Sequence, residues 1–138
     1  MENWANFYLF RSLSDYFTFL KSTQISMQQA YVLTYIFYNG PSKISQICEH
    51  MMVSAAAASQ MVDRLENQYL VERVSDPRDG RVRNVVLSEQ GEIFVEQSVE
   101  ARQSWIKKIP PEFTNDQMNQ IASALQKLSA AYQKSSYS

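Results

Sequence analysis

Three arginines stand close together in a short segment that also carries turn-forming residues. They are Arg78, Arg81 and Arg83, and Pro77 with the pair Asp79-Gly80 predicts a tight turn around them. A guanidinium group on a projecting turn suits a narrow A·T-rich minor groove of DNA, where the negative potential is deepest. The alternative is an exposed turn whose charges are only solvated.

A second set of candidate residues lies in an alanine-rich stretch that precedes these arginines. Alanine methyls can touch thymine methyls, and hydroxyl or amide groups can hydrogen-bond base edges in the major groove. The candidates for such contacts are Ser54, Ala55, Ala56, Ser59 and Gln60. Because alanine is also the best helix former, helix propensity alone explains the run about equally well. So few polar groups would leave much of the specificity to DNA shape.

Two further cations, Lys43 and Arg64, are candidates for contacts with phosphate groups, with ordinary surface ion pairing as the alternative. Between residues 41 and 87, six basic residues stand against six acidic ones, and the whole chain carries a net charge of −1. A neutral module predicts modest nonspecific affinity for DNA. Binding would then depend on a dimer that doubles a few well-aimed cations.

Hydrophobic periodicity predicts that these residues are positioned by helices and one β-hairpin. The chain has 138 residues, enough for one core, so we expect a single domain over residues 1–138. Strands are predicted at 70–74 and 83–87, with the arginine segment as the hairpin turn. Helices are predicted over 4–21, 27–38, 42–51, 54–68, 88 to about 109, and 114–132.

Local signals indicate where the helices begin and end. Ser54 and Ser88 can each act as an N-cap, and Thr114 with Gln117 forms a capping box. Breaks are predicted at Asn39-Gly40-Pro41 and at Pro110-Pro111. In the helix after Ser54, a step of about 100° per residue directs one set of side chains to the core. That set is Ala58, Met61, Val62 and Leu65.

Two terminal helices carry more apolar surface than so short a chain can cover. The segment 4–20 is apolar on nearly every side, which predicts a partner subunit. The last helix has apolar residues at 3–4 spacing, the pattern of a helix that packs on another helix. These are Met118, Ile121, Leu125, Leu128 and Tyr132. The N-terminal aromatics could also line a pocket for a small aromatic effector, although packing is the simpler interpretation.

The composition argues against several other classes of protein. With one histidine, His50, one cysteine, Cys48, and three glycines, the chain offers no Cys/His zinc site, internal disulfide or phosphate loop. We therefore expect no cofactor and no enzymatic activity. Cys48 lies on the apolar face of its helix, which favours an inert buried thiol over an oxidant sensor. The N-terminal segment resembles neither a signal peptide nor a membrane span, so a cytoplasmic protein is expected.

The order helix, turn, helix, hairpin over residues 41–87 is that of a winged helix-turn-helix. Residues 79–91 fit the pattern D-x-R-x(3)-V/I-x-L-T-x-x-G, with Ser88 in place of the usual threonine. Residues 53–54, 59 and 62–66 resemble the recognition helix of a known family, and residues 70–73 resemble the strand that follows it. The chain thus resembles the MarR (multiple antibiotic resistance regulator) family along nearly its whole length. It departs from that family at Tyr69, where glycine is usual, and at Gly80, where a first wing arginine is usual.

This resemblance implies a mainly α fold with a small β-hairpin, in which residues 1–22 and 88–135 form dimerisation helices. It also implies a homodimeric, sequence-specific transcription regulator, a repressor, bound to a pseudo-palindromic operator. The recognition helix would enter the major groove and Arg81 the minor groove, with Asp79 orienting Arg81. The alternative is a winged-helix interaction module that does not bind DNA, which the neutral charge and the alanine run motivate.

Overall fold

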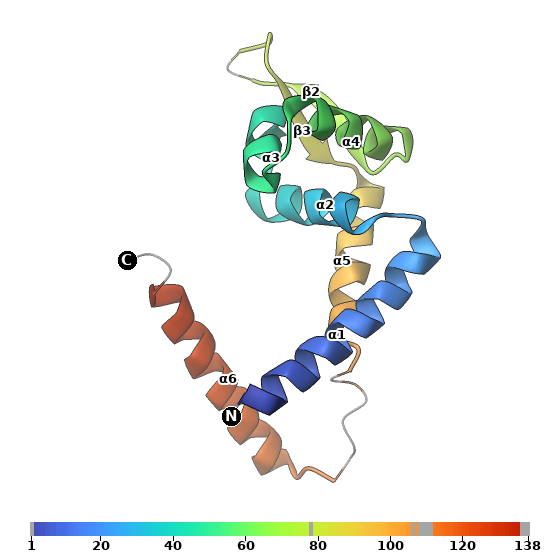
Figure 1. Ribbon diagram of the computed structural model, residues 1–138. Coiled ribbons are helices and arrows are strands. Elements are labelled where there is room, and N and C mark those ends of the chain that lie inside the picture. The colour runs from blue at the N-terminus through green and yellow to red at the C-terminus, as the bar shows by residue number, and fades with distance from the viewer. Residues whose placement is uncertain (1, 78, 106, 108–111, 136–138) are drawn as a thin grey trace. The chain divides into compact units, whose positions relative to one another are not determined.

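The computed structural model describes residues 2–77, 79–105, 107 and 112–135, which are mostly helical with a small antiparallel sheet (Figure 1). The predicted fold class is confirmed. The chain divides into two compact units, Met1–Trp105 and Ile106–Ser138. The elements of the first unit are α1 (Glu2–Thr23), α2 (Met27–Asn39), β1 (Ser42–Lys43), α3 (Ile44–Met51), α4 (Ala55–Asn67), β2 (Val71–Ser75), β3 (Arg83–Leu87) and α5 (Glu89–Gln103). The second unit contains α6 (Asn115–Ser135).

The predicted helix caps are present. The Ser54 hydroxyl accepts from the Ala57 N–H at 3.2 Å, and the Ser88 hydroxyl accepts from the Gly91 N–H at 3.1 Å. The two halves of the predicted capping box at α6 have lengths of 2.9 and 3.3 Å. The break after α2 is also confirmed, since Gly40 adopts a φ of 73°, which favours glycine. These signals are local, so the sequence alone suffices to identify them.

The core of the first unit lies where α2 and α4 meet the sheet and α5. Each fully buried Leu, Ile or Val side chain there contributes about 1.5–3 kcal/mol to stability. From α4 it takes Ala58, Val62 and Leu65, as predicted, while Met61 is half-buried at its edge. The main contributors from other elements are Tyr16, Leu20, Val32, Leu33, Ile36, Ile47, Val71, Val85, Phe94 and Val95.

The sheet has the strand order β1-β3-β2, with both pairs antiparallel. The predicted helix over 42–51 is wrong in its first two residues, which form β1. Ser42 pairs with Val85 and is 2% exposed, and its hydroxyl donates to the Gly40 carbonyl at 2.9 Å. Because these contacts hold Ser42 in an extended conformation at the sheet edge, the helix begins at Ile44.

Helix α5 packs against α1 and ends at Gln103, earlier than the predicted end near residue 109. Two α1 side chains meet its last turn, since the Ser12 hydroxyl donates to the Arg102 carbonyl at 2.9 Å and the Ser104 hydroxyl donates to Asp15 at 2.5 Å. The Ser12 hydroxyl thus supplies a partner for one of the carbonyls that a helix end leaves without one. The predicted continuation through Ile106 and Ile109 to Pro110-Pro111 lies outside the described residues.

One aromatic contact strengthens the junction between α1 and α5. The Arg102 guanidinium lies 5.0 Å from the centre of the Tyr16 ring, a cation–π distance. Burial raises the pKa of Tyr16, and the nearby guanidinium opposes this shift. Tyr16 therefore remains a neutral part of the packing between the two helices.

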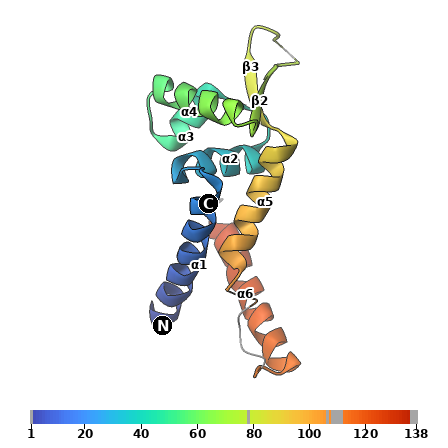
Figure 2. The same cartoon turned by 90° about the vertical axis from the view of Figure 1, so that its right-hand side faces the viewer.

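Within Met1–Trp105, α1 lies at one end, while α3, α4 and the hairpin of β2 and β3 lie at the other (Figures 1 and 2). No helix in the described residues is long and apolar enough to cross a membrane. In α6, the predicted apolar residues from Met118 to Leu128 are 38–59% exposed, and the side chain of Tyr132 lies outside the described residues. An exposed apolar stripe of this kind needs a partner surface.

Candidate nucleic-acid interface

The wing is the loop between β2 and β3, and a few hydrogen bonds determine its shape. The Asp76 N–H donates to the Val82 carbonyl at 2.8 Å, and the Val82 N–H donates to the Asp79 carbonyl at 2.9 Å. Below them, the buried Asn84 amide donates to the Asp76 carboxylate at 3.0 Å. The loop is therefore closed at its base and projects beyond the core.

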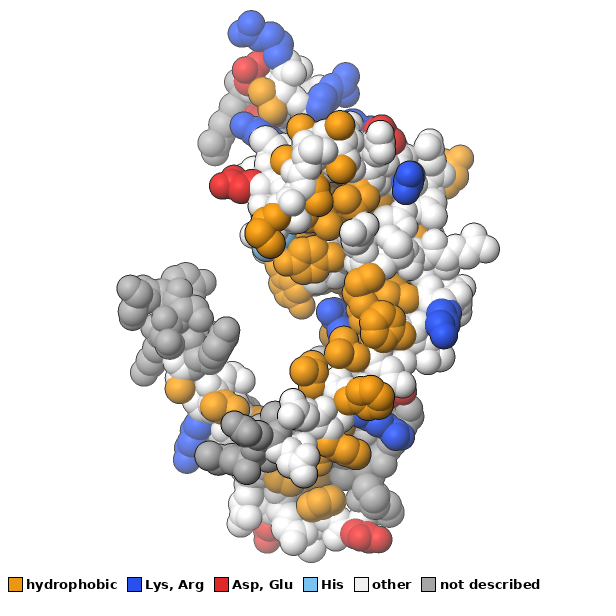
Figure 3. All heavy atoms as spheres, in the orientation of Figure 1, with side chains coloured by type: hydrophobic (Ala, Val, Ile, Leu, Met, Phe, Trp, Pro, Cys, Tyr) orange, Lys and Arg blue, Asp and Glu red, His pale blue; other side chains and the backbone are white. Residues whose placement is uncertain are grey.

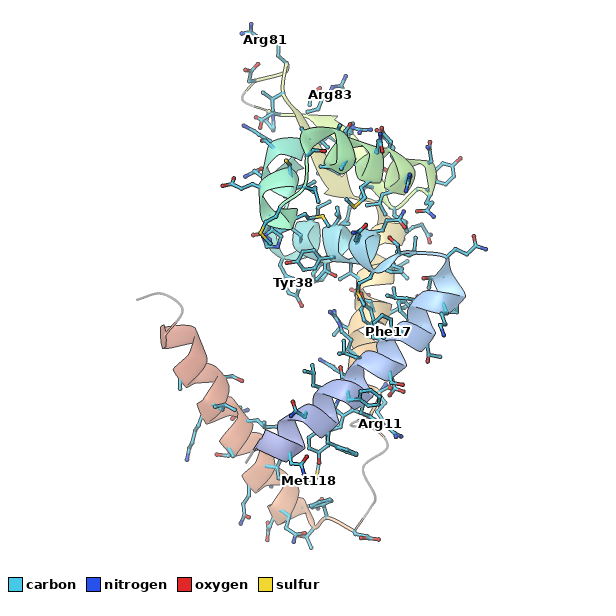
Figure 4. The ribbon with its side chains drawn as sticks, in the orientation of Figure 1. Arg11, Phe17, Tyr38, Arg81, Arg83 and Met118 are labelled. Carbon is cyan, nitrogen blue, oxygen red and sulfur yellow. The ribbon has the colours of Figure 1, made fainter. Side chains whose placement is uncertain are left out.

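Arg81 lies at the tip of this loop (Figure 4), and its side chain is 95% exposed. One oxygen of Asp79 accepts from the Arg81 N–H at 3.1 Å and lies 3.5 Å from the guanidinium Nε. This geometry is consistent with Asp79 as the carboxylate that orients Arg81. Among the described residues, the two terminal guanidinium nitrogens have no partner, so they are free to bind a ligand.

Arg83 and Arg78 are the other two arginines of the wing segment. Arg83 begins β3 opposite Ser75 and is exposed beyond the edge of the core. It points to the same face of the hairpin as the buried Val85, because side chains alternate along a strand. Figure 4 shows Arg83 below Arg81, nearer to α4. Arg78 lies outside the described residues.

The candidate recognition helix α4 presents small side chains on its outer face. Ala55, Ala56 and Gln60 are exposed and Ser59 is half-buried, so the predicted base-contacting residues share an accessible side of the helix. Ser54 uses its oxygen as the N-cap of α4, which leaves its O–H free to donate to a base or a phosphate. Small residues here permit close approach to a groove floor.

Arg64 and Lys43, the candidates for phosphate contacts, are both exposed. Within the described part of the chain, neither side chain forms an ion pair. Lys43 precedes α3, and its backbone N–H donates to the Gln46 side chain at 2.8 Å. Both charges are therefore available for a ligand.

Arg73 is a residue that the sequence patterns did not single out as functional. It lies on β2, two residues after the buried Val71, so its side chain points toward α4. There it contacts Asp63 at 2.5 Å and also binds Glu66. Strand alternation alone places Arg73 on the same side as Val71, and the sequence shows that the two acids are three residues apart. That Arg73 meets both acids depends on how α4 packs on β2.

The turn from α4 into β2 passes through Tyr69, which takes the place of the glycine usual in the resembled family. Tyr69 adopts a left-handed φ of 59° despite its side chain, and the residue is 79% exposed. The turn is closed by bonds from the Tyr69 N–H to Glu66 at 2.9 Å and from the Leu70 N–H to Leu65 at 3.0 Å. The expected turn thus forms, at the cost of a strained conformation.

Gly91, the last position of the matched pattern, has a clear steric reason to be glycine. It lies in the first turn of α5, where a Cβ would stand 2.0 Å from the Leu70 carbonyl oxygen. The same carbonyl accepts from the Ser88 N–H at 3.1 Å. This contact holds the start of α5 against Leu70, the residue that precedes β2.

Cys48 is half-buried against the core, and its thiol donates to the Val53 carbonyl at 2.8 Å. This bond ties α3 to the turn that leads into α4.

An open hollow lies along α1 in the same unit. It is lined by Phe10, Phe17 and Lys21, together with Leu13, Ser14 and Thr18. In this hollow two aromatic rings stand beside a cation, so it is a candidate for the expected aromatic effector.

A family model described as the MarR family matches residues 23–82, which span α2 through the wing. The chain is 31% identical over 107 residues to the HTH-type transcriptional repressor MdtR of Bacillus subtilis (strain 168). That alignment covers 78% of this chain and 69% of the relative.

Two solved structures share the fold. The transcriptional regulator Tm0710 from Thermotoga maritima has a TM-score of 0.87 at 23% identity, covering 99% of this chain and 96% of that one. A mutant of S. aureus MepR bound to an oligodeoxyribonucleotide has a TM-score of 0.68 at 18% identity, covering 88% of this chain and 89% of that one. At these identities the likeness concerns the fold.

Proposed function

The chain belongs to the MarR family of DNA-binding transcription regulators, and we propose that it represses transcription as a homodimer bound to a pseudo-palindromic operator. The observation that carries this proposal is Arg81, a 95% exposed arginine beside Asp79 on a projecting hairpin. The hairpin lies at the same end of its unit as α4 (Figures 1 and 2). A helix and a hairpin at one end can engage two adjacent grooves.

In the proposed complex, α4 enters the major groove with its small outer residues against the bases. Ser59 and Gln60 supply hydrogen bonds, while Ala55 and Ala56 contact thymine methyls. Ser54 likewise donates its O–H to a base edge, while Lys43 and Arg64 bind phosphate groups, which hold the protein in register without reading sequence.

The wing supplies the second part of the proposed contact. Arg81 enters the minor groove, where Asp79 restricts its approach, and Arg83 and Arg78 reach the flanking backbone. Because the module is formally neutral, these few cations would provide most of the electrostatic attraction.

The proposed dimer uses the apolar faces of the terminal helices, within residues 1–22 and 88–135. In α1, Phe7 is 62% exposed, Leu9 59% and Phe10 76%. Figure 3 shows hydrophobic side chains along this helix. Without a partner subunit, water would contact these side chains. Joined through such faces, two winged modules would read half-sites about 34 Å apart.

In vitro selection of genomic DNA fragments at stated salt concentrations tests the function. We expect an enriched pseudo-palindrome whose half-sites lie about one helical turn apart. If no palindrome is enriched, and Arg81→Ala leaves the cellular activity of the protein unchanged, the chain is a winged-helix interaction module instead.

Light scattering coupled to gel filtration tests the dimer. We expect twice the chain mass of 16.0 kDa for the wild type. Leu125→Glu, on the exposed apolar stripe of α6, should shift the mass toward the monomer, whereas the exposed polar substitution Gln126→Glu should not. An unchanged mass for Leu125→Glu would argue against this surface.

A small aromatic effector at the dimer interface would relieve repression by favouring a spacing of the two modules that does not fit the operator. Titration of the operator complex with a benzoate-type acid tests this part of the proposal. Release that is lost in Lys21→Met would support the α1 hollow as the site, whereas unchanged release would exclude it.

A further inference from the structure

Arg73 is a cation in a position that strand geometry directs toward the protein interior. It shares the core-facing side of the hairpin with Val71, its neighbour along β2, and with Val85, its partner across the ladder, each 1% exposed. Its own side chain is 25% exposed. A charged group at the rim of a core costs less free energy when an opposite charge pairs with it.

The partners of Arg73 both belong to α4. Its Nη2 lies 2.5 Å from Asp63 Oδ1, and its Nη1 binds Glu66 Oε2, so one guanidinium spans two carboxylates three residues apart on the helix. The planar fork of arginine suits such a double contact, which a lysine ammonium cannot reproduce. The bridge joins the strand that leads into the wing to the candidate recognition helix.

The bridge also changes the charge that α4 presents. Taken alone, α4 carries Asp63 and Glu66 against the single cation Arg64, a balance of −1. Both carboxylates are well exposed, at 53% and 40%, so a phosphate backbone beside α4 would be repelled by them. With Arg73 included, the balance becomes zero.

We infer that Arg73 is a positioning residue for DNA binding, which acts by neutralising the two carboxylates of α4. The inference rests on the proposed approach of α4 to the major groove. Arg73 itself touches no DNA in this scheme, since its fork is occupied by the two acids. Arg73 reduces the repulsion between the two α4 carboxylates and the phosphate groups of DNA. The winged module carries no net positive charge that could offset this repulsion.

Operator affinity measured across a range of salt concentrations tests this inference. We expect Arg73→Gln to bind about tenfold more weakly at about 100 mM salt, with a deficit that shrinks as salt rises because repulsion is screened. The triple variant with Asp63→Asn and Glu66→Gln added should recover to within about twofold of the wild type. If Arg73→Gln weakened binding only by disturbing the packing of α4 on β2, the deficit would not shrink as salt rises. The triple variant would then not recover the affinity of the wild type.

A second variant covers the case in which Arg73→Gln does not fold. Asp63→Asn with Glu66→Gln keeps Arg73 and removes both acids, so it should bind the operator as tightly as the wild type or more tightly at low salt. Weaker binding by this double variant would overturn the inference.

Arg81→Ala separates failure of the inference from failure of the proposed function. If Arg81→Ala weakens binding and Arg73→Gln does not, the inference is wrong and the binding mode stands. If the triple variant stays as weak as Arg73→Gln, charge neutralisation is likewise wrong. If the wild type binds no DNA at all, both proposals fall together.

Discussion

The wing and the recognition helix handle charge in opposite ways. At the wing tip, Arg81 is 95% exposed, and the Asp79 carboxylate lies 3.5 Å from its Nε, where solvent weakens the attraction. On α4, the two carboxylates are bound by Arg73 in short, bridging contacts, and the outer face is made of small residues. The wing is therefore suited to attract DNA, whereas α4 is suited to fit it closely.

The two regions also differ in how they are supported. Helix α4 buries Ala58, Val62 and Leu65 in the core, so its position follows from packing. The described residues of the wing tip have no such burial, and the loop depends on the bonds at its base between Asp76, Val82 and Asn84. The packed helix α4 is therefore suited to close contact with a ligand, and the projecting wing to electrostatic attraction.

Removal of the wing cation should have the largest effect. We expect Arg81→Ala to weaken operator binding of the dimer by about a hundredfold, because each of two wings loses about 1.4 kcal/mol. The slope of log affinity against log salt should fall by about two. Arg81→Lys, which keeps the charge without the fork, should retain part of the affinity. The measurement is fluorescence anisotropy at several salt concentrations.

A change at the start of α5, where Gly91 packs against Leu70, should come next. Gly91→Ala places a methyl 2.0 Å from the Leu70 carbonyl oxygen, so we expect a loss of about 2 kcal/mol in the free energy of unfolding. Gly80→Ala at the wing tip is the matched control, since its methyl would meet no atom within 4 Å. Urea denaturation followed by circular dichroism measures both. Equal stabilities would mean that the surroundings of Gly91 are no more tightly packed than those of Gly80.

A change on the recognition helix should cost less affinity. We expect Gln60→Ala to lose about 1 kcal/mol at the operator and to relax the preference at one base pair in each half-site. Asn67→Ala, exposed at the far end of α4, serves as the control. If Gln60→Ala abolishes binding while Arg81→Ala is silent, the division of labour between helix and wing is the reverse of the one proposed.

The smallest effect concerns the turn between the two regions. Tyr69→Gly relieves a left-handed residue that is 79% exposed, so we expect the protein to gain about 0.5 kcal/mol of stability. Tyr69→Ala keeps the Cβ and should bring no gain. Thermal unfolding of the three proteins tests this, and a stability loss in Tyr69→Gly would show that the ring packs more than its exposure indicates.

Much of the fold was predictable from the sequence because its signals are local. The caps at Ser54, Ser88 and Thr114 act within three residues, and the hairpin follows from alternation on both sides of a turn. The same holds for the accessible face of α4, since helical periodicity alone separates Gln60 from the buried Val62. The roles of the candidate DNA-binding residues remain predictions that the binding experiments test.

Other features could be decided only by the tertiary structure, because they depend on residues far apart in the chain. Ser42 forms a strand because Val85 pairs with it, and α5 ends where Ser12, 90 residues earlier, binds the Arg102 carbonyl. The partners of Arg73 likewise follow from the packing of α4 on β2. The sequence by itself determined which residues could meet DNA, through periodicity and turn chemistry. Packing decided which charges are paired within the protein, as Arg73 is with Asp63 and Glu66. An ion pair requires that the two side chains be brought within a few ångströms of each other.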